Sequence, residues 1–216
     1  MKLSEDILEK YKKVINDPWE FLHIVNTKDE VDKKNPIKKF PVHLEYIKLF
    51  VRVWQRERLL LIPKSRRMKM SWTNISLFTW DAMFHRGGHF AFISKKEEDS
   101  DALCKRSEFI CKNLELPKEL IPKFECTYNK IRFPEMDSLI QGFPSGADQL
   151  RQYTFTGQLA DEMAFWDNAE DMYSASYPTL EGGGRFVGLS SPAPGFFKRL
   201  VEDKLEDEDA IAKAIG

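Results

Sequence analysis

The eight residues from Lys64 to Ser71 constrain the fold of this chain more than any other segment. They follow the short, continuously apolar run Leu59–Pro63 and precede a segment, 71–85, with the character of a helix. A buried strand, a loop of this length and a helix form a phosphate-binding loop, in which backbone N–H groups hold phosphates and a hydroxyl holds Mg²⁺. The sequence therefore predicts a nucleotide-binding α/β fold.

The loop departs from the usual Walker A pattern, G-x-x-x-x-G-K-[ST]. With Ser71 as the hydroxyl, Lys64 stands at the first glycine, Lys69 at the second and Met70 at the usual lysine. A lysine at the start of the loop can reach the β- and γ-phosphates on its long stem, whereas the Cβ of Lys69 opposes the positive φ that glycine permits. Two interpretations stay open at this point, a phosphate loop and a basic, solvated turn. The candidate ATP-binding residues are Lys64, Ser65, Arg66, Arg67, Met68, Lys69, Met70 and Ser71.

Composition narrows the class of protein. The net charge is −1 with 31% charged residues, so nucleic acid can be contacted only through local basic patches, for which 33–34, 38–39 and 64–69 are the candidates. The chain has three cysteines and no C-x-x-C pair, which argues against a disulfide framework or a zinc site and for a reducing compartment. The sequence has no signal peptide and no run approaching the roughly 20 apolar residues of a membrane span. We expect a cytoplasmic protein without a membrane contact.

Strands and helices are expected to alternate along the chain. Helices are predicted over 4–15, from 17–18 onward, and over 41–56, 71–85, 97–113, 169–177 and 196–215. Strands are predicted over 59–62, 90–94 and 185–189, with strand character over 124–143 around a turn at 128–130 and a short strand ending at 159–160. This order predicts an α/β fold with right-handed crossovers and a mainly parallel central sheet between layers of helices.

Two further segments carry chemistry. Asp161 and Glu162 end a short strand about ninety residues beyond the loop, where an aspartate can position Mg²⁺ and the adjacent glutamate can polarise the attacking water, as in a Walker B motif. Ser190 and Ser191 end the apolar strand 185–189, where a hydroxyl can contact the γ-phosphate or its water. A Ser-Ser-Pro turn that merely closes a strand is the alternative for these two serines.

The order of loop, carboxylates and serines resembles the N-terminal ATPase domain of large terminase subunits, the motors that package DNA into tailed-phage capsids. Three segments carry the resemblance: 64–67 (a lysine at the first loop position, then Ser-x-Arg), 161–166 (D-E-x-A-F) and 183–192, similar to the family's coupling motif. The resemblance implies a three-layer P-loop NTPase core over 41–195, a helical extension over 1–40 and a connector over 196–216 toward a nuclease domain that this chain lacks.

The resemblance also assigns roles to individual residues. Lys64 and the loop would bind ATP, Ser71 and Asp161 would hold Mg²⁺, Glu162 would activate water, and Ser190 and Ser191 would couple hydrolysis to movement. Arg151 would be an arginine finger supplied to a neighbouring subunit, although Arg66 and Arg67 compete for that role and Gln152 replaces the family's usual glycine. Whether Lys64 or Lys69 meets the phosphates stays open. Phe40 and His43 stand where the family has its adenine-contacting segment.

Partners follow from the same resemblance. We expect double-stranded DNA, a portal protein, a small terminase subunit and self-association into a ring on the procapsid, in the host cytoplasm, with a monomer in isolation and without DNA cleavage. The alternatives are a helicase-like or kinase-like P-loop domain and a non-catalytic nucleotide-binding module. His85 and His89 bracket two glycines but have no third ligand nearby in the sequence, so no zinc is assigned to them.

Overall fold

The computed structural model describes residues 4–205, apart from the side chains at 147, 148, 177, 180 and 205. Its helices are α1 (Glu5–Asn16), α2 (Pro18–Leu22), α3 (Glu45–Arg56), α4 (Met70–Phe84), α5 (Glu97–Lys112), α6 (Ala147–Leu150), α7 (Ala169–Glu181) and α8 (Phe196–Leu205), with short 3-10 turns η1 (Lys118–Leu120), η2 (Pro134–Met136) and η3 (Met163–Phe165). Its strands are β1 (Asn26–Lys28), β2 (Ile37–Lys39), β3 (Leu59–Pro63), β4 (His89–Ser94), β5 (Glu125–Thr127), β6 (Lys130–Phe133), β7 (Ser138–Pro144), β8 (Gly157–Asp161) and β9 (Arg185–Ser190).

A seven-stranded sheet forms the centre of the molecule, in the order β3-β9-β8-β4-β7-β6-β5. The first five strands are parallel, and β6 and β5 are added antiparallel at one edge through a hairpin. The hairpin turns at Asn129, whose φ of 57° is the left-handed conformation that a tight turn needs. The mainly parallel α/β architecture expected from the sequence is confirmed.

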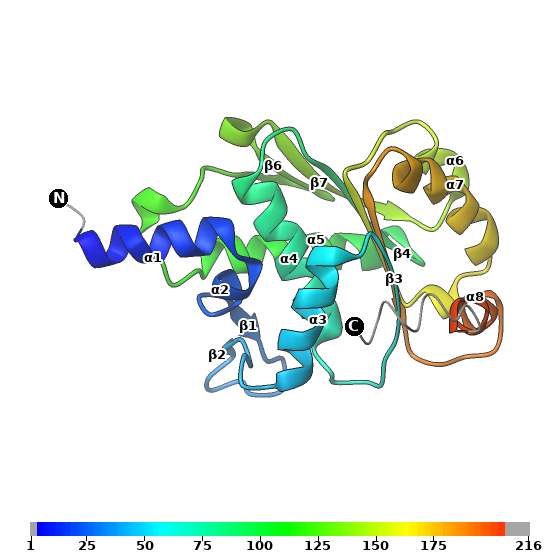
Figure 1. Cartoon of the computed structure of the whole chain (residues 1–216), viewed down its shortest axis with the longest axis horizontal. Helices are drawn as coiled ribbons and strands as arrows, with labels where there is room; N and C mark the ends of the chain where they lie inside the picture. The colour runs from blue at the N-terminus through cyan, green and yellow to red at the C-terminus, as the bar shows by residue number, and fades with distance from the viewer. Residues whose placement is uncertain (1–3, 206–216) are drawn as a thin grey trace.

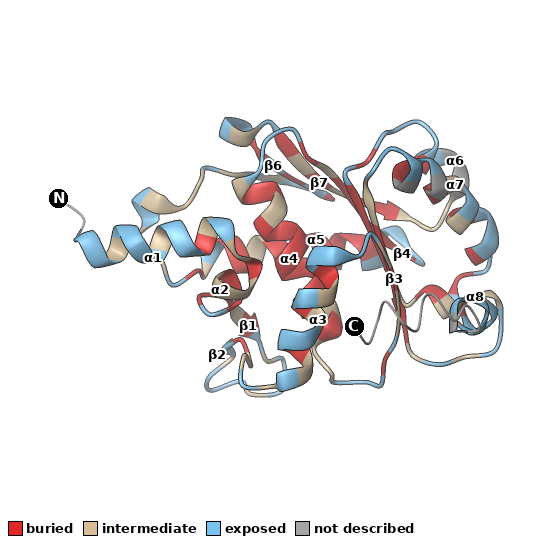
Figure 2. Ribbon diagram, viewed as in Figure 1, coloured by how far each residue is buried: buried red, intermediate tan, exposed pale blue. Residues whose placement is uncertain are grey.

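Helices cover both faces of the sheet (Figure 1). Side chains of β4 alternate between the two layers, because Phe90 and Phe92 pack in one hydrophobic cluster and Ala91 and Ile93 in the other. The first cluster lies under α1 to α5, and the second under α6, α7 and α8. Helix α4 is buried along nearly its whole length, which explains why its apolar residues are not confined to one side (Figure 2).

The first two helices begin where their capping residues predict. The Oγ of Ser4 accepts a hydrogen bond from the N–H of Ile7 at 3.4 Å, and Asp17 Oδ1 accepts one from the N–H of Trp19 at 2.8 Å. Two other boundaries differ from the prediction. Helix α3 begins at Glu45 rather than at 41, and α7 continues through Pro178 to Glu181 rather than ending at 177.

The two ends of the described chain are part of the packed structure. Residues 1–40, expected to be helical, also contain the antiparallel pair β1–β2, and Phe21 and Leu22 of α2 lie in the same cluster as the central strands. Helix α8 was expected to be a connector, yet Phe197 is buried in the second cluster. The remainder of the predicted 196–215 helix, from 206 on, lies outside the described residues. Within residues 4–205, no helix has the length and apolar character needed to cross a membrane.

Candidate nucleotide site

The sheet order brings the three predicted motifs to one edge of the sheet. Strand β9 lies between β3 and β8 and is parallel to both, so the carboxyl ends of all three strands are neighbours. The loop after β3, the carboxylates at the end of β8 and the serines at the end of β9 therefore meet. The carboxyl ends of parallel strands are where open α/β sheets bind ligands.

Lys64 and Glu162 form the central contact of the site. Lys64 Nζ lies 2.6 Å from Glu162 Oε1, although 98 positions separate the two residues in the sequence. The lysine side chain is only 8% exposed and the glutamate side chain is 40% exposed. The backbone N–H of Lys64 donates to the carbonyl of Ser190 at 2.9 Å, which fixes the start of the loop to the end of β9.

Ser71 and Asp161 form a second contact beside the first. The Oγ of Ser71 donates to Asp161 Oδ1 at 3.1 Å, and Asp161 is nearly buried. Burial raises the pKa of Asp161; Lys64 opposes this effect and Glu162 adds to it. A hydroxyl and one carboxylate fit Mg²⁺, which takes one or two carboxylates from a protein and completes its octahedron with substrate phosphates and water. The donors present therefore suit Mg²⁺ carried in with a nucleotide.

Glu162 is held by the end of β9. Its Oε2 accepts hydrogen bonds from the N–H of Ser191 at 3.1 Å and from the Oγ of Ser190 at 3.4 Å. Burial acts to raise the pKa of Glu162, but the hydrogen bonds from Lys64 and Ser191 outweigh it and place the pKa below its ordinary value. The carboxylate is therefore ionised at neutral pH, as a base must be. The same Ser190 hydroxyl accepts from the N–H of Ala164 at 3.1 Å.

The loop from Lys64 to Ser71 contains two left-handed residues, although it has no glycine. Lys69 has φ 56° and ψ 11°, so the position predicted to be the second glycine does take the left-handed conformation. Arg67 is also left-handed, with φ 67°. Met70, at the usual lysine position, is 4% exposed and therefore belongs to the interior rather than to the site. Of the two loop lysines, Lys64 is the one that contacts Glu162.

The N-terminus of α4 faces this loop without a side-chain cap. The side chain of the N-cap residue, Lys69, makes no capping hydrogen bond, and the first turn of the helix contains no acidic residue. Such a helix start leaves N–H groups and the positive end of the helix dipole available for an anion. Because α4 is fifteen residues long, its dipole is fully developed at this end.

The other residues predicted for the nucleotide site do not take part in the Lys64–Glu162 and Ser71–Asp161 contacts. Ser65, Arg66 and Arg67 are exposed on the loop, and Met68 is partly buried. Arg151 is exposed on the turn after α6, and the structure does not place it in the contacts that join Lys64, Ser71, Asp161 and Glu162. Phe40, which stands where the family has its adenine-contacting segment, is 3% exposed and packs in the first core cluster. His43 is exposed.

Two supporting residues were missed in the sequence. The hydroxyl of Tyr46 on α3 donates to the carbonyl of Met68 at 3.1 Å and so ties the loop to a helix before it. The indole N–H of Trp166 donates to the carbonyl of Asp161 at 3.1 Å, which fixes the end of β8. A signal existed only for Trp166, because it belongs to the aromatic segment that follows the carboxylates. Nothing in the sequence links positions 46 and 68.

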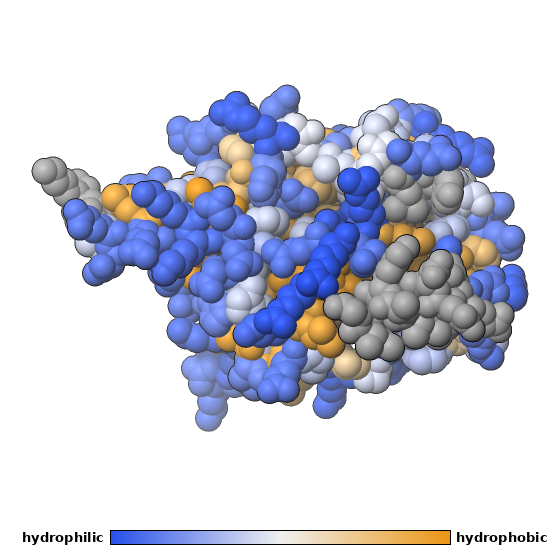
Figure 3. Space-filling view, in the orientation of Figure 1, coloured by the Kyte–Doolittle hydropathy of each residue, from blue (hydrophilic) through white to orange (hydrophobic). Residues whose placement is uncertain are grey.

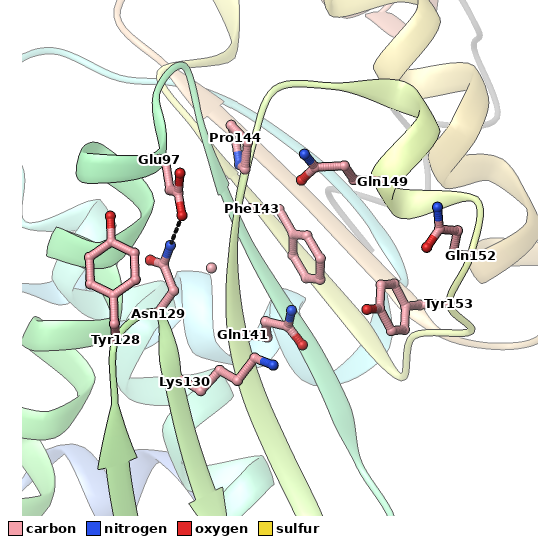
Figure 4. A pocket seen from close by; sticks show the side chains of 11 residues that line it. Glu97, Tyr128, Asn129, Lys130, Gln141, Phe143, Pro144, Gln149, Gln152 and Tyr153 are labelled. Atoms are coloured by element: carbon pink, nitrogen blue, oxygen red, sulfur yellow. Dashed lines mark hydrogen bonds between the residues drawn. The ribbon is translucent and has the colours of Figure 1, made fainter.

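A separate polar pocket of about 430 Å³ lies at the far side of β4, between the β5–β6 hairpin and the turn after α6 (Figure 4). Asn129 Nδ2 donates to Glu97 Oε1 at 3.3 Å across one wall. The pocket is lined by Glu97, Tyr128, Asn129, Lys130, Gln141, Gly142, Phe143, Pro144, Gln149, Gln152 and Tyr153. None of the predicted ATP-binding or metal-binding residues contributes to it. Among the described residues, moreover, no three His, Cys, Asp or Glu side chains gather as a metal cluster.

Comparison with solved structures identifies the fold. The chain resembles the large terminase ATPase domain of Thermus phage P74-26, with a TM-score of 0.55 and 16% identity over 66% of this chain and 63% of that one. It resembles the large terminase of bacteriophage HK97 with a TM-score of 0.64 and 10% identity over 93% of this chain and 42% of that one. A third similar structure is the large terminase of the thermophilic phage D6E in complex with ADP (TM-score 0.54, 15% identity, 92% and 43% coverage).

No protein-family profile matches the sequence, and no curated protein matches it. The similarity therefore establishes the fold, a P-loop NTPase architecture like that of terminase ATPase domains, as the sequence predicted. The chain spans about two-fifths of the length of the HK97 and D6E proteins that it matches.

Proposed function

We propose that this chain is a Mg-ATP hydrolase, the ATPase part of a motor that moves double-stranded DNA into a viral procapsid. The observation that carries the proposal is the meeting of Lys64 with Glu162 and of Ser71 with Asp161 at the ends of β3 and β8. A cation, a metal-binding hydroxyl–carboxylate pair and an ionised base within one site are the parts that phosphoryl transfer to water requires.

In this mechanism the N-terminus of α4 and the loop backbone bind the phosphates. Lys64 would turn from Glu162 to the β- and γ-phosphates, and Ser71 and Asp161 would hold Mg²⁺, which would supply positive charge to the phosphates. Glu162, released from the lysine, orients and deprotonates the attacking water. Ser190 and Ser191 contact Glu162 and therefore sense whether it is engaged, which supports their proposed role in coupling.

Arg151 is proposed to complete the site of a neighbouring subunit. It is exposed on the turn after α6, where a second copy can meet it. Turnover would then depend on a ring assembled on the procapsid, with DNA, a portal protein and a small subunit as partners, while the isolated chain is a monomer in the host cytoplasm. An isolated chain is expected to bind Mg-ATP and to hydrolyse it slowly.

Calorimetric titration with Mg-ATP tests the nucleotide site directly, because binding does not require the ring. We expect saturable binding by the unmodified chain, loss of binding in Lys64→Ala, and retained binding in Lys69→Ala. Lys12→Ala removes an exposed positive charge from α1 and serves as the control. Loss of binding in Lys69→Ala alone would reassign the phosphate contact, and no binding by the unmodified chain would contradict the proposal.

A further inference from the structure

Helix α3 carries a row of positive charges along its exposed side. Lys48, Arg52 and Arg56 lie four residues apart and are all exposed, and Arg58 follows just beyond the helix. In the space-filling view a deep blue, strongly hydrophilic band crosses the molecule diagonally in the region of α3 (Figure 3). We call Lys48, Arg52, Arg56 and Arg58 the α3 basic row.

The charges of this row are not neutralised within the described part of the chain. On α1 and α5, Lys13 follows Glu9 by four positions and Lys112 follows Glu108 by four, and both lysines form ion pairs with these acids. On α3 the residue four positions before Arg52 is Lys48, and the one four before Arg56 is Arg52. No ion pair joins Arg52 or Arg56 to an acid among residues 4–205; Lys48 lies over the Trp19 ring at 5.8 Å.

This arrangement costs helix stability unless an anion is nearby. Like charges four apart on a helix repel each other by about 0.2–0.5 kcal/mol per pair. The three positive charges on the helix span about 12 Å, since each four-residue step rises about 6 Å. A linear array of phosphates matches this pattern, because duplex DNA presents one negative charge per ~1.7 Å of its axis.

The helix that carries the row is also connected to the nucleotide site. At its first turn, Tyr46 donates to the carbonyl of Met68 in the phosphate loop at 3.1 Å. At its last turn, the Arg185 guanidinium donates to the carbonyls of Trp54 and Glu57 and stacks 3.6 Å from the centre of the Trp54 ring. Arg185 begins β9, the strand whose other end holds Glu162.

We propose that the α3 basic row binds the phosphate backbone of duplex DNA and that α3 relays this contact to the nucleotide site. The identity of the polymer rests on the proposed function, whereas the location rests on the unpaired charges. The row contains no aromatic side chain on which an unpaired base can stack, so it suits the backbone of a duplex better than the bases of a single strand. Sequence inspection missed the row because its members are spaced by helical turns rather than contiguous.

The test measures binding of a fluorescent 30-base-pair duplex by anisotropy across a salt series. The double variant Arg52→Gln/Arg56→Gln is compared with Lys10→Gln/Lys12→Gln, which removes the same charge from exposed positions on α1. We expect the α3 variant to bind about tenfold more weakly at low salt, with a salt slope lower by about two, and the α1 variant to bind like the unmodified chain.

Equal affinity of the two variants for the duplex would overturn the proposal. The proposal would also fail if polyglutamate of equal charge displaced the labelled duplex as readily as unlabelled duplex does. Melting temperatures and Mg-ATP titrations of the same proteins keep the two questions separate. If all variants bind Mg-ATP but only the α3 variant loses DNA, the inference stands. If Mg-ATP binding is absent throughout, the proposed function fails independently of the result with DNA.

Discussion

Replacing Glu162 with glutamine separates the two tasks that the proposed mechanism gives this side chain. Its carboxylate holds Lys64 at 2.6 Å, so in the proposed mechanism ATP has to take the lysine from it. The Glu162→Gln variant keeps the shape of the side chain and removes its charge. We therefore expect it to bind Mg-ATP more tightly and to hydrolyse it more slowly than the unmodified chain.

The size of the binding effect follows from the geometry. A hydrogen bond to a charged partner contributes about 1.5–3 kcal/mol, but Glu162 is 40% exposed, and solvent screening lowers the figure to about 1 kcal/mol. A difference of about 1 kcal/mol corresponds to a roughly fivefold lower Kd for Mg-ATP. Loss of the general base should slow hydrolysis by about 10²–10⁴-fold.

Calorimetry gives the Kd, and single-turnover hydrolysis by the assembled or concentrated protein gives the rate. The control is Glu119→Gln, which removes the same charge from an exposed position on the 3-10 turn η1. If Glu162→Gln binds Mg-ATP as weakly as the control or more weakly, the Lys64–Glu162 pair does not compete with the nucleotide, and the reasoning is wrong.

Three further predictions concern stability and reactivity. Because burial raises the pKa of Asp161, its charge destabilises the folded state as pH rises through that pKa. In urea titrations the free energy of unfolding of Asp161→Asn should therefore increase relative to that of the unmodified chain between pH 3 and 7. A difference between the two proteins that stays the same across this pH range would contradict the prediction. Lys69→Gly should raise the free energy of unfolding by about 0.5–1 kcal/mol by relieving the left-handed lysine, whereas Lys96→Gly, at extended φ −123°, should lower it. Burial raises the pKa of the Cys104 thiol to about 12, so iodoacetamide at pH 8 should modify it only after denaturation, as mass spectrometry of the native and unfolded chain will show.

The order of the site motifs was predictable because each motif ends a strand. Apolar runs that stop at Lys64, Asp161 and Ser190 place polar groups at the carboxyl ends of parallel strands, where they have to meet. The contact between Lys64 and Glu162 was not predictable from spacing, because it depends on β9 entering between β3 and β8. The roles of these residues in catalysis stay predictions.

Local rules failed where the surroundings decide the conformation. Lys69 takes a glycine-like backbone at the start of α4, where its carbonyl accepts from Thr73 Oγ1 at 2.9 Å and the side chain of the following residue, Met70, is buried. Helix α7 runs past Pro178 for another turn, which ends where the N–H of Gly182 donates to the Pro178 carbonyl at 3.0 Å. A proline rule applied to the sequence alone stops this helix too early.

Strand β9 is hydrogen-bonded to a parallel neighbour along both of its edges. Its six residues span about 20 Å, from Arg185 beneath the end of α3 to Ser190 beside Glu162. A strand clamped in this way cannot stretch or rotate alone, so a push at one end reaches the other as a shift of the whole segment. The strand therefore connects the outer end of α3 mechanically to the candidate nucleotide site, and its amides should be among the last to exchange with deuterium, with or without nucleotide.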